Sequence, residues 1–220
     1  MKRGTGRPPA YKCTDGKRVP GATTILSRYK DSGGLIHWAW KQGVEGLDYR
    51  KTRDDAADAG SLAHDLIECE IHGEIPIVPP GTDPEIETRA RSALENYRQW
   101  KESNRLEIIE TEQPFVSELY RFGGTLDAIG ILRGNLCLID WKTSNQVYAD
   151  YLCQIAAYTL LWEEFRDQPI KEAHLLRFDK EFGSFAHHRW DRKVIDTATE
   201  AFLLMRKLYD LDAVLKRAAA

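Results

Sequence analysis

The sequence has no long apolar run. Among its 220 residues, the longest stretch without a charged side chain is the 12 residues from Tyr151 to Trp162, whereas a membrane-spanning helix needs about 20. The N-terminus is basic, but no apolar segment follows it, so a signal peptide is not indicated. These absences predict an intracellular protein with no membrane partner.

Cysteine is also scarce. The four cysteines, Cys13, Cys69, Cys137 and Cys153, are scattered and form no C-x-x-C pair, so free thiols in a reducing cytosol are expected. Internal repeats and low-complexity segments are absent. With 42% hydrophobic and 30% charged residues, the chain is neither disordered nor collagen-like, and its length predicts one globular domain over residues 1–220.

The chain lacks a basic excess. It has 31 Lys and Arg against 34 Asp and Glu, a formal net charge of −3, so the total does not indicate a nucleic-acid partner. The distribution is uneven, because residues 1–30 carry eight Lys or Arg and a single acid, Asp15. We expect residues 1–10 to be a flexible basic lead-in, and a local basic arm can attract phosphate even when the total charge is acidic.

The first half of the chain reads as mainly helical over residues 20–103. Thr23 or Thr24 is the expected cap of a short helix that reaches Tyr29, and residues 33–58 are interpreted as helical. An apolar repeat from Ala59 to Ile67 at i, i+3, i+4, i+7 and i+8 predicts one face of a further helix. Asp83 is predicted to cap another helix, with Pro84 in its first position.

The second half, residues 104–220, reads as sheet with flanking helices. Short apolar segments bounded by turn residues predict six strands: Leu106–Glu110, Phe115–Tyr120, Thr125–Leu132, Leu136–Lys142, Ala173–Phe178 and Phe185–Trp190. A helix is expected from about Asp150 to Phe165, and a last one after its cap, Asp191. This order predicts a mixed α/β (α+β) fold.

Two carboxylates and a lysine meet in the predicted hairpin between the third and fourth of these strands. Asp140 and Lys142 are two residues apart on one strand, so they point to the same face. If Gly134-Asn135 is a two-residue loop, Asp127 lies opposite Lys142, and a three-residue loop shifts the pairing by one. In either register the three side chains lie within about 5–8 Å of one another.

This trio has two readings. One is a surface hairpin that ends in an ordinary ion pair. The other is a site for a hard divalent cation such as Mg²⁺, which takes carboxylate oxygens together with water and substrate phosphate. Such an ion lowers the pKa of bound water and neutralises developing charge, while a nearby lysine can orient or deprotonate the attacking water. That combination suits phosphodiester hydrolysis.

Four motifs in order resemble those of one family. Gly123–Asp127 matches a G-x-x-D strand, Asp140–Ser144 matches D-x-K-T-S, Gln154–Tyr158 matches Q-x-x-x-Y, and Gly60–His64 matches G-x-x-x-H. Residues 19–26 are also similar to its V-P-S-V-T-T-I-L opening, with Gly21 in place of serine. On these motifs the chain resembles the PD-(D/E)XK nuclease superfamily, in its RecB-like exonuclease branch, over most of its length. The mitochondrial genome maintenance exonuclease type is similar too.

The resemblance implies a restriction-endonuclease-like central mixed sheet flanked by helices, with an N-terminal helical segment that grips DNA. It implies one or two Mg²⁺ or Mn²⁺ ions held by His64, Asp127, Asp140 and the carbonyl of Trp141. It further implies the catalytic set Lys142, Asp140, Asp127, Gln154 and Tyr158. An iron–sulfur cluster of the kind found in some relatives is not expected, because no cysteine follows Cys153.

Several candidates for DNA contacts have plain structural alternatives. Thr143 and Ser144 could donate hydrogen bonds to phosphate, or simply cap a turn. Thr23 and Thr24 lie in the opening motif and are further candidates. Aromatic residues near Lys41 and Arg53, among them Trp38 and Trp40, could stack on bases, with core packing as the alternative. Two further candidates are less favoured: Glu112 reads first as a solvated strand-end residue and second as a neighbour of the site, and adjacent His187 and His188 are poor chelators because they point to opposite faces.

The expected function is a metal-dependent deoxyribonuclease, an exonuclease that acts at DNA ends in recombination, repair or phage DNA processing. Its substrate is expected to be DNA that is single-stranded or has a free end. A helicase, a recombinase or an annealing protein is a candidate partner. Two alternatives remain: a structure- or sequence-specific endonuclease on the same fold, and a non-catalytic DNA-end-binding subunit. The expected location is the cytoplasm of a bacterium or a phage-infected cell, with an organellar source also open.

Overall fold

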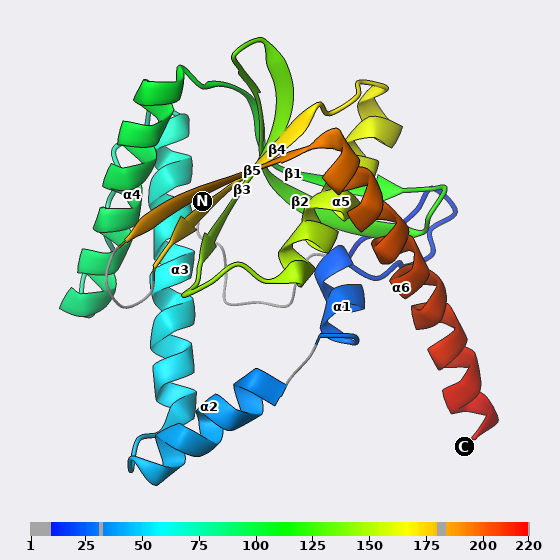
Figure 1. The fold of residues 1–220 in the computed structure, drawn as a ribbon, viewed down its shortest axis with the longest axis horizontal. Coiled ribbons are helices and arrows are strands. Elements are labelled where there is room, and N and C mark those ends of the chain that lie inside the picture. The colour runs from blue at the N-terminus through cyan, green and yellow to red at the C-terminus, as the bar shows by residue number, and fades with distance from the viewer. Residues whose placement is uncertain (1–9, 31–32, 180–183, 220) are drawn as a thin grey trace.

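The computed structural model describes residues 10–30, 33–179 and 184–219, and it contains a five-stranded sheet between helical layers (Figure 1). The strand order is β1-β2-β3-β4-β5, with β3 and β4 parallel and the other neighbours antiparallel. The strands are β1 (Glu107–Ser117), β2 (Phe122–Leu132), β3 (Asn135–Thr143), β4 (Glu172–Phe178) and β5 (Phe185–Asp191). The predicted mixed sheet flanked by helices is confirmed.

Helices surround the sheet and also form the N-terminal part of the chain. They are α1 (Ala22–Ser27), α2 (Gly33–Val44), α3 (Tyr49–Ile71), α4 (Pro84–Asn104), α5 (Ala149–Arg166) and α6 (Arg192–Ala218). The helix α5 connects the parallel strands β3 and β4, as such crossovers require. None of the helices in the described part of the chain has the length and apolar character needed to cross a membrane.

The sheet separates two hydrophobic cores. On one side, α1, α5 and α6 bury residues such as Ile25, Trp162 and Phe202 against it. On the other side, α3 and α4 pack as a pair and bury Leu66 and Tyr97, and Figure 1 shows this pair beside the sheet. Side chains alternate along a strand, so β3 contributes to both cores.

The predicted helix ends are partly confirmed. Asp83 and Asp191 cap α4 and α6 as expected, each accepting a hydrogen bond from a backbone N–H of the first turn. The prediction that Thr23 or Thr24 caps α1 is wrong, since the N-cap is Gly21 and no side chain closes that end. The helical prediction for 33–58 holds only with a break, because α2 ends at Val44 and α3 begins at Tyr49, where the side chain of Asp48 accepts from Arg50 N.

The two strands predicted at Leu106–Glu110 and Phe115–Tyr120 are one continuous strand, β1. It keeps its pairing with β2 through the supposed gap, and the irregularity is a bulge between Ile108 and Glu110 rather than a turn. The strand is also kinked at Glu112, which adopts a positive φ of 50°. The residues at this local irregularity therefore led to the prediction of two strands where the structure has one.

The hairpin between β2 and β3 turns one residue earlier than the predicted two-residue loop Gly134-Asn135. Leu132 pairs with Asn135, so the two loop residues are Arg133 and Gly134, both with positive φ, as in a type I′ turn. Both predicted registers are therefore wrong, because continuing the observed one places Asp127 opposite Asp140 rather than opposite Lys142. The three side chains nevertheless remain neighbours.

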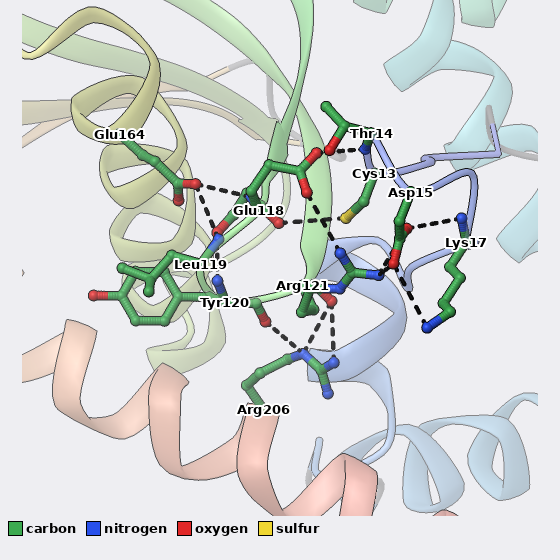
Figure 2. A network of polar contacts seen from close by, with 11 residues as sticks. Cys13, Thr14, Asp15, Lys17, Glu118, Leu119, Tyr120, Arg121, Glu164 and Arg206 are labelled. Carbon is green, nitrogen blue, oxygen red and sulfur yellow. Dashed lines mark hydrogen bonds and ion pairs between the residues drawn. The ribbon is translucent and has the colours of Figure 1, made fainter.

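A short N-terminal hairpin is fastened to the connection between β1 and β2 (Figure 2). Lys12 pairs with Arg18, and the intervening turn is held by the Arg121 guanidinium, which donates to Asp15 at 2.8 Å. Thr14 N donates to Glu118 Oε1 at 2.6 Å. The rest of the predicted lead-in, residues 1–9, lies outside the described residues.

Candidate active site

Asp127, Asp140 and Lys142 converge where β2 and β3 run side by side. The Lys142 ammonium lies 2.7 Å from Asp140 Oδ2 and 4.0 Å from Asp127 Oδ2. Asp127 is held in turn by the backbone N–H of Trp141, which donates to its Oδ2 at 3.1 Å. Asp140 is only 1% exposed, so this trio is not the solvated surface ion pair that the sequence also allowed.

Burial and charge act against each other in this trio. Burial raises the pKa of Asp140, the Lys142 ammonium opposes that shift, and the negative charge of Asp127 adds to it. Burial alone would lower the pKa of Lys142, but the two carboxylates outweigh it and raise that pKa. Lys142 therefore stays an ammonium in the metal-free protein.

A second cluster shares Asp127. His64 on α3, Glu112 on β1 and Asp127 on β2 each present a ligand atom, and these atoms lie within 4.8 Å of one another. Two carboxylates and an imidazole are suitable donors for Mn²⁺ or Mg²⁺, so the side chains fit a divalent cation. The favoured reading of Glu112 as a solvated strand-end residue is wrong, because it is partly buried within β1.

Glu112 was hidden by the secondary-structure prediction. With two strands assumed, residue 112 falls in a connection, whereas the continuous β1 places it opposite Asp127 in the observed register. The sequence gives little sign of this continuous strand, because Glu112 and Gln113 are polar and Pro114 is tolerated only at a sheet edge. Nor does it show the positive φ at Glu112.

Trp141 and His64 interact through two pairs of atoms. The Trp141 indole N–H donates to His64 Nδ1 at 2.8 Å, and the Trp141 carbonyl oxygen lies 3.1 Å from His64 Nε2. His64 Nδ1 also lies 3.9 Å from Asp127 Oδ1. The structure thus brings the predicted ligands His64, Asp127 and Trp141 O together, while the Asp140 carboxylate is occupied by Lys142.

The predicted pair on α5 lies beside this site. Gln154 Nε2 donates to the Tyr158 hydroxyl at 2.7 Å. Tyr158 is buried, and its burial raises its pKa, opposed by the Lys142 ammonium. It packs over Gly124, where a Cβ would come within 2.7 Å of the ring. The glycine of the G-x-x-D motif therefore makes room for the tyrosine of the Q-x-x-x-Y motif.

Thr23 and Thr24 line a cavity of about 190 Å³ together with Tyr158 and Gly124. Tyr11 and Arg18 of the N-terminal hairpin form its opposite wall. The Tyr11 hydroxyl is also 3.0 Å from Thr125 Oγ1, two residues before Asp127. The opening motif is thus brought next to the candidate active site.

Thr143 and Ser144 have different surroundings. The Thr143 Oγ1 atom is buried without a hydrogen-bond partner, and it lies 3.4 Å from where a Cβ on Gly60 would be. The Ser144 hydroxyl donates to Gln146 O at 2.9 Å, which is the turn-capping arrangement. A phosphate contact by Ser144 would require that bond to be exchanged.

Lys41 and Arg53 lie farther away, on α2 and the first turns of α3. Lys41 pairs with Glu45 at 3.8 Å, and Arg53 with Asp54 at 2.7 Å. Arg53 precedes His64 by eleven residues, or about 16 Å along the helix axis. The neighbouring Trp40 is 62% exposed, so core packing does not explain it.

The adjacent histidines His187 and His188 point to different partners, as their strand positions predict. His187 Nε2 lies 2.8 Å from His174 Nδ1 on β4, whereas His188 stacks on Trp190. Neither belongs to the cluster of His64, Glu112 and Asp127.

Comparisons with known proteins identify a family and a fold. The sequence profile described as the PD-(D/E)XK nuclease superfamily matches residues 8–215. No curated protein sequence matches the chain. A crystal structure of a protein from Eubacterium rectale, assigned provisionally as an exonuclease, matches 66% of this chain and 64% of its own length, at 10% identity and a TM-score of 0.50. This likeness shows the fold.

A second solved structure is similar at a lower level. The alkaline exonuclease LHK-Exo from Laribacter hongkongensis shares 16% identity over 74% of this chain and 90% of its own, with a TM-score of 0.33. The same enzyme in complex with dAMP shares 16% identity over 75% of this chain and 91% of its own, with a TM-score of 0.38.

Proposed function

The chain belongs to the PD-(D/E)XK nuclease superfamily, and on this premise we propose that it is a divalent-metal-dependent deoxyribonuclease, an exonuclease that acts at DNA ends. The observation that carries the proposal is the convergence of Asp127, Asp140 and Lys142, with His64 and Glu112 alongside. A protein that only binds DNA has no need of two close, buried carboxylates next to a lysine.

We propose that His64, Glu112 and Asp127 hold a Mg²⁺ or Mn²⁺ ion, with Asp140 as a further candidate ligand. The Trp141 carbonyl, also predicted as a ligand, lies 3.1 Å from His64 Nε2 and can contribute only after it releases the histidine. When bound, such an ion supplies a polarised phosphate oxygen and a water of lowered pKa. The side chains must first be oriented, and the Trp141 N–H does this for Asp127 at 3.1 Å.

Lys142 is proposed to act by its positive charge. Because the two carboxylates raise its pKa, the ammonium is a better donor than a base in the metal-free protein. It can therefore orient a water or stabilise charge that develops on the phosphoryl oxygens. Deprotonation of the water by Lys142 would require its pKa to fall first.

DNA is proposed to enter along the wall that carries Thr23, Thr24 and Tyr158, with Gln154 positioning the Tyr158 hydroxyl. The unpartnered Thr143 hydroxyl and, after exchange of its turn bond, Ser144 are candidate phosphate donors. Lys41 and Arg53 are proposed to contact a longer DNA segment from α2 and α3.

The wider role is a proposal that rests on the family resemblance alone. We propose DNA that is single-stranded or has a free end as substrate, and recombination, repair or phage DNA processing as the process. A helicase, recombinase or annealing protein is the proposed partner, and the cytoplasm the proposed location.

Degradation of matched linear and covalently closed circular DNA in Mg²⁺ tests the proposal. We expect the linear form alone to be degraded, and EDTA to stop the reaction. The variants Asp127→Asn and Lys142→Met should lose activity about 100-fold or more, the scale set by removing one group that stabilises transition-state charge. Lys216→Met, at an exposed position near the end of α6, is the matched control and should stay active.

Three results would contradict the proposal. Degradation of closed circles would make the protein an endonuclease. Full activity of both site variants, or activity in EDTA, would remove these residues and the metal from the mechanism. Binding of DNA ends without cleavage by the wild type would indicate a non-catalytic subunit.

A further inference from the structure

Trp141 contacts both ring nitrogens of His64. The indole N–H of Trp141 donates to Nδ1, and the carbonyl of the same residue lies at hydrogen-bond distance from Nε2. An imidazole that accepts at Nδ1 and donates at Nε2 is the neutral tautomer with its proton on Nε2. The fold therefore selects this tautomer for the metal-free protein.

The Nδ1 atom is also close to a carboxylate of the cluster, at 3.9 Å from Asp127 Oδ1. A histidine ligand binds through a lone pair while its other N–H donates to a carbonyl or carboxylate, which fixes the ring. The contact from Nε2 to the Trp141 carbonyl supplies that second bond. His64 is thus already oriented as a ligand through Nδ1, and its lone pair is engaged by the indole N–H.

We propose that the indole N–H of Trp141 occupies the metal-binding lone pair of His64 in the metal-free protein, so that Trp141 orients this ligand and weakens cation binding at the site. This inference rests on the proposed metal-dependent function. In it Trp141 is a positioning residue, which acts through His64 and not on the substrate.

Because the Trp141 indole is buried, it is costly for a cation to displace its N–H from His64 Nδ1. Trp141 is 1% exposed, and its ring packs edge-on against Tyr97 with centroids 6.1 Å apart. The indole is therefore enclosed by the core between the sheet and α3 and α4, and water cannot replace the acceptor that it loses when Nδ1 is taken. A buried donor left without an acceptor is destabilising, because it has given up its bond to water without gaining another.

The variant Trp141→Phe tests whether the indole N–H competes with the cation. It removes the N–H but keeps an aromatic ring and the backbone carbonyl. Titration with Mn²⁺ alone, without DNA, followed by electron paramagnetic resonance of the free ion, gives the dissociation constant. We expect it to be about ten-fold lower in Trp141→Phe than in the wild type, which corresponds to about 1.4 kcal/mol. An equal or higher dissociation constant overturns the inference.

Trp100→Phe is the matched control. Trp100 is buried in the same core, and its indole N–H has no hydrogen-bond partner, so the substitution opens a similar space without freeing a histidine. Its Mn²⁺ affinity should equal that of the wild type. A gain in Trp100→Phe as large as in Trp141→Phe would show that loosened packing is the cause, and would overturn the inference.

Nitrogen-15 spectra of the metal-free histidines provide a readout independent of affinity. We expect His64, assigned by its loss in His64→Gln, to carry its proton on Nε2, and the other tautomer to become populated in Trp141→Phe. A wild-type His64 protonated on Nδ1 would overturn the inference.

Different results would contradict the proposed metal-dependent nuclease and the proposed role of Trp141. Wild-type Mn²⁺ binding that is lost in Asp127→Asn but unchanged in Trp141→Phe leaves the proposed nuclease intact and overturns only the role of Trp141. Absence of Mn²⁺ binding by the wild type overturns both.

Discussion

Two consecutive glycines of β2, Gly123 and Gly124, let aromatic rings pack close to the strand. A Cβ on Gly123 would meet the Tyr11 ring at 2.3 Å, and one on Gly124 would meet the Tyr158 ring at 2.7 Å. Real Cβ atoms do not approach other atoms so closely, so a side chain at either position would displace a ring. These glycines therefore serve close packing beside Asp127.

Gly124→Ala should displace Tyr158 and uncouple it from Gln154. We expect a loss of nuclease activity per folded molecule and a loss of about 1–3 kcal/mol in the free energy of unfolding, the usual cost of overpacking. Urea denaturation and DNA degradation by the folded fraction measure the two effects.

The control is Gly130→Ala on the same strand. A Cβ there would lie 2.7 Å from Glu107 O, so stability should also fall, but Tyr158 is not involved. Activity per folded molecule should be retained. If both variants lose activity equally, the displacement of Tyr158 is not the cause.

At the scale of elements, the cavity lined by Tyr11, Thr23 and Thr24 depends on Arg206 of α6. The Arg206 guanidinium is almost completely buried and donates to the carbonyl oxygens of Tyr120 and Arg121, at 3.1 and 3.0 Å (Figure 2). It thereby holds the connection between β1 and β2 that carries the N-terminal hairpin. The same connection is held from α5 by Glu164, which accepts from the backbone N–H groups of Glu118 and Leu119.

Arg206→Met should leave those carbonyls without their donor. We expect the free energy of unfolding to fall by about 1–3 kcal/mol, because two part-buried carbonyl groups lose the hydrogen bonds that they accept from a buried guanidinium. Chemical denaturation measures this loss.

Arg217→Met on the same helix is the comparison, since Arg217 is exposed and donates to Ala213 O of its own helix. It should change stability by less than about 0.5 kcal/mol, as surface substitutions usually do. A similar loss in both variants would show that Arg206 has no special role in holding the connection.

At the scale of the whole molecule, the candidate site draws on both helical layers. The strand β3 directs Trp141 into the core with α3 and α4, whereas the Lys142 ammonium on the next residue lies 5.9 Å from the Tyr151 ring of α5. His64 therefore reaches the site from one layer, and Gln154 and Tyr158 reach it from the other. Assembly of the site requires both cores to form.

The pH dependence of the free energy of unfolding is a property of the whole molecule, and buried His174 is one source of it. His174 is fully buried on β4, and its burial lowers its pKa, opposed by Glu172. The folded protein therefore keeps His174 neutral where the unfolded chain, with a histidine pKa of about 6.5, binds a proton.

Stability is consequently expected to fall as the pH drops below about 6.5, with a contribution from His174 of at most about 1.4 kcal/mol per pH unit. Urea unfolding across this range should show a shallower dependence in His174→Gln than in the wild type, whatever its absolute stability. His37→Gln, at an exposed position on α2, should keep the wild-type slope. An unchanged slope in His174→Gln would exclude this source.

The amino-acid sequence by itself determined several helices, two of their caps and the shared face of Asp140 and Lys142. Apolar periodicity marked α3 and α4, and the caps Asp83 and Asp191 were recognisable because capping depends on a few neighbouring residues. The i, i+2 spacing placed Asp140 and Lys142 on one face, since strands alternate. Each of these features depends only on residues close together in the chain, so each can be recognised in the sequence.

Only the tertiary structure decided the rest. It joined β1 into one strand and brought Glu112 to Asp127, because pairing with β2 overrides a local bend. It set the hairpin register through positive φ at Arg133 and Gly134. It also placed the Trp141 indole on His64, 77 residues away in the chain. Contacts between residues so far apart depend on how the two helical layers pack against the sheet, and that packing is a property of the folded chain.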